Sequence, residues 1–500
     1  MAKIQISHLT FAYEGSPDLI FDDASFQLDT DWKLGFIGRN GRGKTTLLRI
    51  LCGELDSHGA VSAPVRFEYY PFPVPDPGSS PLALAAQMDE KNETWRFLRE
   101  ADQLDIGPDC LGRPFATLSG GEQAKVLLAI LFAKENHFLL IDEPTNHLDI
   151  AGRQVVSRYL NGKKGFILVS HDRAFLDGCV DHILSINRAS IDVQKGNFST
   201  WEENKRRQDQ FSLEKNEKLK KEISSLRAAA RQAHAWADKA ESTKIGNVPG
   251  AHERPKNARS YAGEKSRRMQ QRRKNLENRM EKEIEEKEGL LDDLEKADDL
   301  KIFPLRHPSK TLIHCKEMLF SYGGAPVIPP LSFTLENGGI LALTGRNGCG
   351  KSSVLRAIAG EIPLSGGEMR LASGLILSIV PQHAHLSGDL RDYIRASGAD
   401  ETLFKTILRK LDFSRAQFDK DMASFSAGQQ KKVLIARSLC QQAHLYLWDE
   451  PLNYIDVLSR MQIERLIREF HPTMILVEHD AAFLRNTGAR QIDLDKSDQP

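Results

Sequence analysis

Gly38-Arg-Asn-Gly-Arg-Gly-Lys44-Thr45 and Gly345-Arg-Asn-Gly-Cys-Gly-Lys351-Ser352 are two copies of one pattern, G-x-x-x-x-G-K-[ST], and their lysines are 307 positions apart. Each copy follows a short apolar run and precedes a helix-prone one. The glycines let consecutive backbone N–H groups turn towards phosphate oxygens, and the helix N-terminus adds partial positive charge. The sequence therefore predicts two phosphate-binding loops, each between a strand and a helix.

Two further motifs repeat at the same offset, which indicates a duplication. Phe138-Leu-Leu-Ile-Asp142-Glu143 and Leu445-Tyr-Leu-Trp-Asp449-Glu450 are apolar runs that end in paired carboxylates. A single acidic pair after a strand is more often the start of a solvated loop. The repeated register favours instead two Walker B strands of an α/β fold.

These motifs predict two ATP sites with bound Mg²⁺. Oxygen ligands suit Mg²⁺, so we expect Thr45 with Asp142 and Ser352 with Asp449 to hold the ion. Glu143 and Glu450 would polarise the water that attacks the γ-phosphate. The residues predicted to bind the phosphates are Gly38, Asn40, Gly41, Gly43, Lys44, Thr45 and Thr46 in the first copy, and Gly345, Asn347, Gly348, Gly350, Lys351, Ser352 and Ser353 in the second.

Leu118-Ser-Gly-Gly-Glu-Gln123 resembles the signature motif of ATP-binding-cassette (ABC) domains. In that family the signature of one cassette caps the ATP held by the Walker motifs of the other. The resemblance implies a first composite site, Lys44 with Ser426, and a second, Lys351 with Ser119, paired within one monomeric chain.

The resemblance also assigns further contacts to ATP. A lone histidine after a strand is more often structural, but here His171 and His479 match the switch histidines of the family. The other residues implied are the signature residues Ser119, Gly120, Gly121, Ser426 and Gly428, the adenine-stacking aromatics Tyr13 and Tyr322, and the metal-sensing Gln382.

The two copies are unequal. The second signature has Ala427 where the first has Gly120, and its extra methyl is expected to crowd a phosphate contact. Phe72 stands where the second copy has Gln382 and cannot bind a metal. We therefore expect slower hydrolysis at the first composite site.

Composition sets outer limits on the architecture. The 500 residues, 40% of them hydrophobic, suit two cassettes at 1–200 and 306–500 joined by a linker at 201–305. The longest apolar runs are too short to cross a membrane, so no membrane segment is expected, and the long linker argues against pairing with a separate membrane subunit. The six cysteines lack C-x-x-C spacing, which is typical of reduced thiols and a cytoplasmic location.

Charge within the linker is strongly uneven. Residues 205–280 hold 21 Lys or Arg against 9 Asp or Glu, whereas 281–300 hold 3 against 10. Apolar residues recur at helical spacing on both sides of the breaker-rich segment Gly246-Asn-Val-Pro-Gly250, which predicts an antiparallel helical hairpin with its tip near 244–261. A solvated coiled-coil linker is the alternative reading.

Basic residues interleaved with aromatic ones at the tip favour RNA binding. The predicted RNA-binding residues are Lys244, His252, Arg254, Lys256, Arg259, Tyr261, Arg267, Arg268, Arg272 and Arg273.

Two tandem cassettes, a long helical linker and no membrane domain resemble the ABC-F family over essentially the whole chain. Within it, the linker and the segment Glu450-Pro-Leu-Asn-Tyr-Ile-Asp456 look like the antibiotic-resistance members of the Lsa and Vga types. This resemblance implies an ATPase that binds the 70S ribosome, with the linker reaching 23S rRNA and P-site tRNA. It implies protection from lincosamides, streptogramin A compounds and pleuromutilins. The alternatives are a housekeeping ABC-F translation factor, a transporter ATPase subunit, and a DNA-repair or condensation ATPase.

Overall fold

The computed structural model describes residues 2–13, 19–88, 94–146, 148–187, 191–245, 279, 299–321 and 328–495. The chain forms two compact units. One consists of Met1–Trp201 with Ala297–Pro500 and contains both cassettes, and the other is Glu202–Lys296. The linker boundaries at 201 and 305 stay a prediction.

The first cassette combines two sheets with two groups of helices. An antiparallel sheet has the strand order β2-β1-β4, and a larger sheet has the order β5-β6-β7-β3-β8-β9, in which only β9 pairs antiparallel. The strands are β1 Lys3–Phe11, β2 Phe21–Asp29, β3 Lys33–Gly38, β4 His58–Ser62, β5 Arg66–Tyr70, β6 His137–Asp142, β7 Phe166–Val169, β8 His182–Ile186 and β9 Ile191–Lys195. The helices are α1 Lys44–Leu51, α2 Pro81–Met88, α3 Thr94–Gln103, α4 Pro108–Gly112, α5 Gly120–Ala133, α6 Ile150–Asn161 and α7 Arg173–Cys179.

The second cassette repeats this plan. Its antiparallel sheet has the order β11-β10-β13, and its parallel sheet has the order β14-β15-β16-β12-β17. The strands are β10 Thr311–Leu319, β11 Leu331–Glu336, β12 Ile340–Thr344, β13 Gly366–Leu371, β14 Leu377–Val380, β15 Leu445–Asp449, β16 Met474–Val477 and β17 Arg490–Asp493. The helices are α10 Lys351–Ile358, α11 Leu390–Ala396, α12 Glu401–Lys410, α13 Ala427–Cys440, α14 Val457–Phe470 and α15 Ala481–Thr487.

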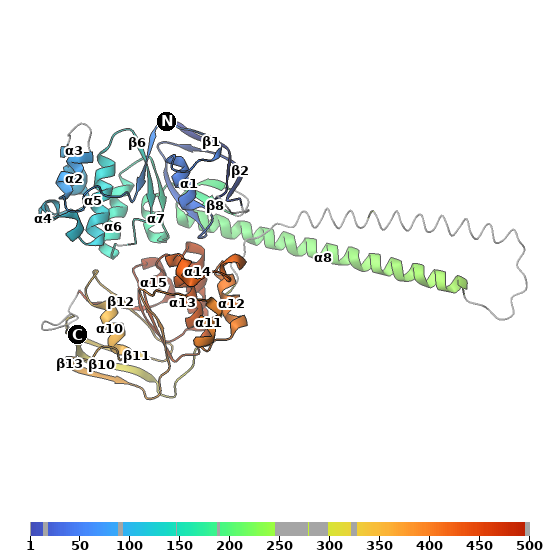
Figure 1. Cartoon of the computed structure of the whole chain (residues 1–500). Helices are drawn as coiled ribbons and strands as arrows, with labels where there is room; N and C mark the ends of the chain where they lie inside the picture. The colour runs from blue at the N-terminus through green and yellow to red at the C-terminus, as the bar shows by residue number, and fades with distance from the viewer. Residues whose placement is uncertain are drawn as a thin grey trace, which may run out of the picture. The chain divides into compact units, whose positions relative to one another are not determined.

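Strand order explains why the motifs meet. In the first cassette β6, β7 and β3 are neighbours and parallel, so their carboxyl ends lie at one edge of the sheet. The acidic pair follows β6, the predicted switch histidine His171 follows β7, and the phosphate loop follows β3. Figure 1 shows α2 to α5 gathered at the opposite side of this cassette from β1 and β2. Ligands of such sheets bind at the carboxyl ends of the strands.

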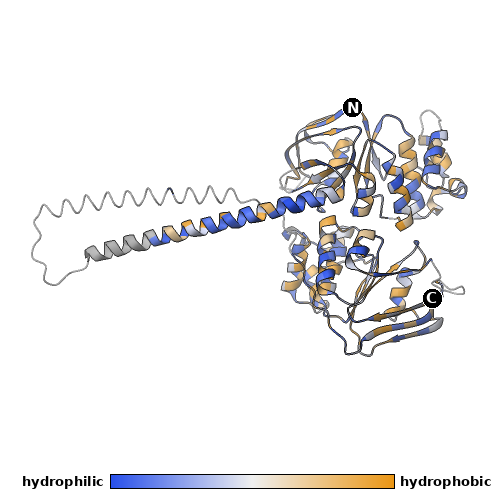
Figure 2. Cartoon of the chain, turned by 180° about the vertical axis from the view of Figure 1, so that it is seen from behind, coloured by the Kyte–Doolittle hydropathy of each residue, from blue (hydrophilic) through white to orange (hydrophobic). Residues whose placement is uncertain are grey.

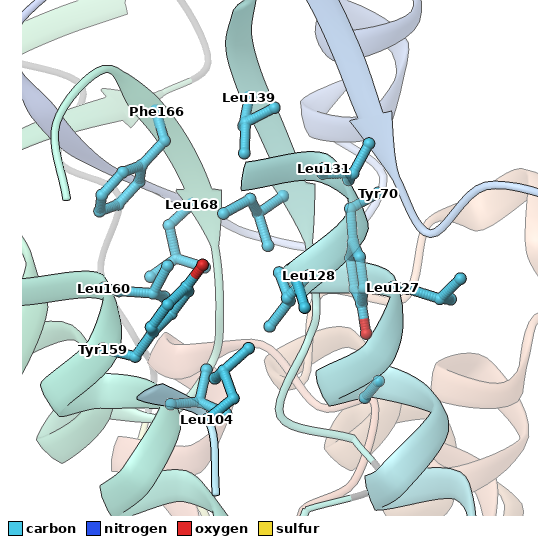
Figure 3. Packing of buried hydrophobic residues seen from close by; sticks show 14 of the residues in the cluster. Tyr70, Leu104, Leu127, Leu128, Leu131, Leu139, Tyr159, Leu160, Phe166 and Leu168 are labelled. Atoms are coloured by element: carbon cyan, nitrogen blue, oxygen red, sulfur yellow. The ribbon is translucent and has the colours of Figure 1, made fainter. Parts of the chain in front are cut away.

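The helical part of the first cassette packs on the same sheet. Leu127, Leu128 and Leu131 of α5 are buried in one cluster with Tyr159 and Leu160 of α6 (Figure 3). The signature motif is at the start of α5. The helix that follows the signature and the Walker B strand β6 therefore share one hydrophobic cluster.

The linker begins with the long helix α8, Phe198–Ile245. Its side chains are mainly hydrophilic, in contrast to the apolar strands of the cassettes (Figure 2). This helix confirms the first arm of the predicted hairpin. Lys244 lies on it, whereas the second arm and the predicted RNA-binding residues from His252 to Arg273 lie outside the described residues.

None of the described helices has an apolar stretch long enough to cross a membrane.

Candidate functional site

Both phosphate loops have the backbone that the glycines predict. Gly41 and Gly43 have φ of 81° and 90°, and Gly348 and Gly350 have φ of 81° and 99°. These values lie in the left-handed region, which favours glycine. A Cβ on Gly43 would also lie 2.4 Å from Ile20, so space and conformation both require glycine there.

The two loop lysines start the following helices and turn back over the loops. Lys44 Nζ donates to the carbonyl oxygens of Gly38 at 2.7 Å and Arg39 at 3.1 Å. Lys351 Nζ donates to the equivalent carbonyl oxygens, at 2.9 and 2.8 Å. The ammonium groups are therefore held at the mouth of each loop, where phosphate oxygens would be neutralised.

The predicted metal ligands come together in both cassettes. Thr45 Oγ1 donates to Asp142 Oδ2 at 2.9 Å, and Ser352 hydrogen-bonds to Asp449. Asp449 Oδ1 is buried without a hydrogen-bond partner in the described part of the chain. Burial also raises the pKa of Asp449. A hydroxyl beside a carboxylate with a spare oxygen fits Mg²⁺.

The two predicted catalytic glutamates share an unusual backbone. Glu143 and Glu450 have φ of 52° and 45°, which is uncommon for residues other than glycine and is often found at functional sites. His171 Nε2 lies 3.3 Å from Glu143 Oε1, and His479 Nε2 lies 3.7 Å from Glu450 Oε1. Each switch histidine thus faces the glutamate of its own cassette.

The electrostatic settings of the two glutamates differ. Burial and the charge of Asp142 raise the pKa of Glu143 to about 8. Burial acts in the same direction on Glu450, but interactions with His479 and Gln382 outweigh it and lower its pKa to about 2. The surroundings therefore shift the pKa values of the two glutamates in opposite directions, upward for Glu143 and downward for Glu450.

The first composite site is assembled across the two cassettes. Asn40 Nδ2 in the first phosphate loop donates to the carbonyl oxygen of Tyr454 at 2.8 Å. A Cβ on Gly428 of the second signature would lie 2.5 Å from that same oxygen and 3.2 Å from Asn40 Nδ2. The close approach is thus at Gly428, whereas Ala427, where we expected crowding, is exposed.

Charged residues add to this junction. Arg39 and Arg42 of the first loop lie 3.9 and 3.6 Å from Asp412 of the second cassette. Burial lowers the pKa of Lys44, and the charge of Asp456 in the second cassette partly opposes this. The first phosphate loop therefore contacts the opposite cassette through both hydrogen bonds and charges.

The signature serines cap their helices. Ser119 and Ser426 accept the backbone N–H groups of Glu122 and Gln429, each at 3.3 Å. In both cassettes the N3 side chain bonds back to the serine N–H, which completes a capping box. Gly120 and Gly121 begin α5, so the first signature presents a helix N-terminus.

The predicted adenine-binding residues are only partly described. Tyr13 is 46% exposed, and its hydroxyl lies 3.0 Å from Thr46 Oγ1 at the start of α1. The ring is therefore beside the phosphate loop. Tyr322 lies outside the described residues.

The region of Gln382 differs between the cassettes in an unforeseen way. Gln382 contacts Glu450, and Phe72 packs against the apolar core. In the first cassette the Tyr69 hydroxyl donates to Asp142 Oδ2 at 2.9 Å. The motifs gave no sign of Tyr69, although its place near the end of strand β5, next to the strand that ends in Asp142, could have drawn attention to it.

Lys431 is a second residue that the motifs did not predict. Its buried ammonium donates to the carbonyl oxygens of Pro381 at 2.9 Å, Gln382 at 3.1 Å and Asp449 at 3.2 Å. It ties the signature helix α13 to the segment after β14 and to the Walker B strand. The equivalent residue in α5 is Ala124.

The family model described as "ABC transporter" matches residues 21–146 and 328–453, the regions that hold these motifs. The chain belongs to the ABC family and is an ABC-F ATPase. As the tandem cassettes indicate, this ABC-F chain binds ATP.

Similar curated proteins span nearly the whole ABC-F chain. The ribosome protection protein VmlR of Bacillus subtilis is 27% identical, over 95% of this chain and 84% of its own length. ATP-binding protein Uup of Caulobacter vibrioides is 28% identical, over 95% of this chain and 75% of its own length. The energy-dependent translational throttle protein EttA of Haemophilus influenzae is 24% identical, over 95% and 89%.

Solved structures of low identity share the fold. A crystal structure of archaeal ribosomal stalk protein aP1 with the archaeal ribosome recycling factor aABCE1 matches with a TM-score of 0.62 at 19% identity, over 97% of this chain and 87% of that one. A structure titled RNase-L Inhibitor matches with a TM-score of 0.61 and the same identity and coverage.

Proposed function

We propose that the chain hydrolyses Mg-ATP at two composite sites that form within a single, monomeric molecule. The observation that carries this proposal is the junction of Asn40, Tyr454 and Gly428, in which the first phosphate loop meets the signature and the following loop of the other cassette. A chain that supplies both halves of the site needs no second cassette subunit. Thr45 with Asp142, and Ser352 with Asp449, would hold Mg²⁺.

Each side chain has a distinct role in this reaction. Lys44 and Lys351 neutralise the β- and γ-phosphates, and the backbone N–H groups of the loops bind the same oxygens. Bound Mg²⁺ supplies charge that stabilises the leaving phosphate oxygens. Glu143 and Glu450 would each accept a hydrogen bond from the attacking water at their own site, and contacts with His479 and Gln382 lower the pKa of Glu450. His479 lies 3.7 Å from Glu450 and would contact the γ-phosphate.

The proposed partner is the ribosome, and the proposed location is the cytoplasm. The names of VmlR and EttA, which match this chain through both cassettes and the linker, support a role in translation. The positive balance of residues 205–280, 21 Lys or Arg against 9 Asp or Glu, supports an RNA contact, and Lys218, Lys220 and Lys221 are members of this set that lie on α8. The linker would reach 23S rRNA and P-site tRNA, with its tip near 244–261.

ATP would drive this role by closing the cassettes. A ligand shifts a conformational equilibrium only through its preference for one state, so ATP has to bind the closed pair more tightly. Closure would fix the linker on the ribosome, and hydrolysis would release it. A Glu143→Gln/Glu450→Gln variant should then co-sediment with ribosomes in ATP, and a Lys44→Ala/Lys351→Ala variant should not. Equal sedimentation of both variants would contradict this cycle.

The more specific proposal is protection from antibiotics that act at the peptidyl-transferase centre. The similarity to VmlR favours it, and the name of EttA favours the housekeeping alternative. We would express the chain in a susceptible bacterium and measure inhibitory concentrations for a lincosamide, a streptogramin A compound and a pleuromutilin. The matched controls are a deletion of 244–261 and the Glu143→Gln/Glu450→Gln chain. No change for any drug would favour the housekeeping role.

A further inference from the structure

A polar triad built around a buried ion pair joins the two cassettes beside the first composite site. Arg173 of the first cassette donates from Nη2 to Glu464 Oε2 of the second. The other carboxylate oxygen of Glu464 accepts from Asn486 Nδ2 at 2.8 Å. The Arg173 and Glu464 side chains are only 7% and 10% exposed. The carboxylate is thus satisfied from both cassettes.

The duplication identifies the equivalent position on the other side of the cassette pair. Asp172 and Asp480 cap α7 and α15, so Arg173 corresponds to Ala481. The same pair of helices relates Asn486 to Gly178, and Asp149 and Asp456, which cap α6 and α14, relate Glu464 to Ser157. The equivalents of Arg173, Glu464 and Asn486 are Ala481, Ser157 and Gly178.

A cavity takes the place of the triad on that side. It has a volume of about 280 Å³, and Ser157, Gly178 and Ala481 all line it. Gly178 packs so closely that a Cβ there would lie 2.3 Å from Ser157 Oγ. All three members of the triad have therefore been replaced by small residues, and nothing equivalent to the ion pair bridges the cassettes at these three positions.

The two sides belong to different composite sites. Arg173 comes two residues after His171, and Glu464 is on α14, which follows the loop whose Tyr454 contacts Asn40. The triad therefore adjoins the first composite site. The cavity is lined by His479, the switch histidine beside Glu450. It therefore adjoins the catalytic residues of the second.

A buried ion pair is an effective device for holding two bodies together. Its net contribution to stability is small, because both charges lose their hydration. The pair can form only while the cassettes are closed, because Arg173 and Glu464 belong to different cassettes. Removing one partner leaves the other charge buried without its counterpart and mainly accelerates dissociation. The triad therefore resists opening of the cassettes on its own side, and the cavity offers no such resistance.

We propose that Arg173, Glu464 and Asn486 are positioning residues that keep the first composite site closed while the second opens and closes. They act through His171 and α14 and need not touch ATP. The first site would then retain its nucleotide over many turnovers of the second. This inference rests on the proposed pair of composite ATP sites and not on the proposed ribosomal partner.

The test is nucleotide retention in the Glu143→Gln/Glu450→Gln chain. The chain is loaded with labelled Mg-ATP and chased with unlabelled ATP, and release is followed over time. We expect one slow and one fast phase of release. Lys44→Ala, which disables the first site, should remove the slow phase, and Lys351→Ala, which disables the second site, should remove the fast phase. Arg173→Ala should accelerate the slow phase about tenfold or more and leave the fast phase unchanged within about twofold.

Three further variants separate positioning from a general loss of structure. Arg173→Glu/Glu464→Arg should restore slow release, because the pair is re-formed with its charges exchanged. Ser157→Glu/Ala481→Arg should build the ion pair in the cavity and slow the fast phase, and Gly178 is kept because a Cβ there would lie 2.3 Å from the γ position of residue 157. Arg158→Ala, which removes a cation that lines the cavity, is the matched control and should leave both phases unchanged.

The proposal would be overturned by single-phase release from the parent chain. It would also be overturned if Arg173→Ala accelerates both phases equally or neither, or if the transplanted ion pair leaves the fast phase as it was. If Arg173→Ala does not fold, Glu464→Gln decides the question, because it keeps the side-chain shape and removes the charge.

Discussion

Glu478 provides a quantitative test of the electrostatics at the second cassette. The carboxyl is 3% exposed and accepts two backbone N–H groups, from Leu452 at 2.9 Å and from His479 at 3.1 Å. Burial raises its pKa from 4.5 to about 7, Arg460 partly opposes this, and Asp480 adds to it. Folding therefore favours the protonated form of this group.

The sign of the pH dependence follows from this shift. Between pH 4.5 and 7 the unfolded chain has an ionised Glu478, whereas the folded chain keeps the proton. The free energy of unfolding therefore falls as the pH rises through this window. At about 1.4 kcal/mol per pKa unit, the loss between pH 4.5 and 8 is about 3 kcal/mol.

Glu478→Gln removes the titration but also one hydrogen bond. Its amide oxygen can still accept from Leu452, while its NH₂ group faces the N–H of His479, a loss of about 1 kcal/mol. The variant should thus be more stable than the parent by about 2 kcal/mol at pH 8 and less stable by about 1 kcal/mol near pH 4.5. At about 2 to 4 °C per kcal/mol for a domain of this size, the second cassette should melt about 4 to 8 °C higher at pH 8.

Thermal unfolding between pH 5 and 8, followed by near-UV circular dichroism, would measure this effect. Glu361→Gln, at an exposed glutamate, is the matched control and should retain the parent's pH dependence. A Glu478→Gln chain with the parent's slope would refute the reasoning, because some other group would then be responsible for the titration.

Three further predictions concern single contacts. Gly428→Ala should lower turnover at the first composite site by about tenfold, measured in the Glu450→Gln chain, since its Cβ would lie 2.5 Å from a carbonyl oxygen; unchanged turnover would contradict the close approach. Tyr69→Phe should raise the Mg²⁺ concentration needed for half-maximal ATPase activity about tenfold at the first site only, because Asp142 loses an orienting hydrogen bond. An equal effect at both sites would argue against this role. Lys431→Met should lower the melting temperature of the second cassette by several degrees through the loss of three hydrogen bonds. Ala124→Met places the same side chain at the equivalent position of the first cassette, where no such hydrogen bonds are lost.

Local patterns predicted the local structure well. The strand before Gly38, the helix that starts at Lys44 and the acidic end at Asp142 were all readable, because glycine conformation and apolar runs act over a few residues. The offset of 307 also predicted that the second cassette repeats the first. The resemblance to ABC-F ATPases is confirmed by the family match and the similar proteins.

Contacts between distant segments could not be predicted. The hydroxyl of Tyr69 reaches Asp142 across neighbouring strands, and Asn40 meets Tyr454 across 414 positions of sequence. Nor do Ser157 and Gly178 stand out in the sequence, because small residues on helices are common. Their significance follows only from a comparison with the equivalent residues of the second cassette, Glu464 and Asn486. The assignments of individual site residues stay predictions, to be tested by the variants above.

Fusion of both cassettes into one polypeptide has an evolutionary consequence. In a symmetric dimer of identical subunits, any substitution appears on both sides of the interface, so an Arg173–Glu464 bridge would be present twice or not at all. A fused pair escapes this constraint, because its two cassettes differ in sequence and each always pairs with the other. Selection can then act on one side alone. Duplication followed by divergence becomes a route from two equivalent ATP sites to one site that retains its nucleotide and one that turns over.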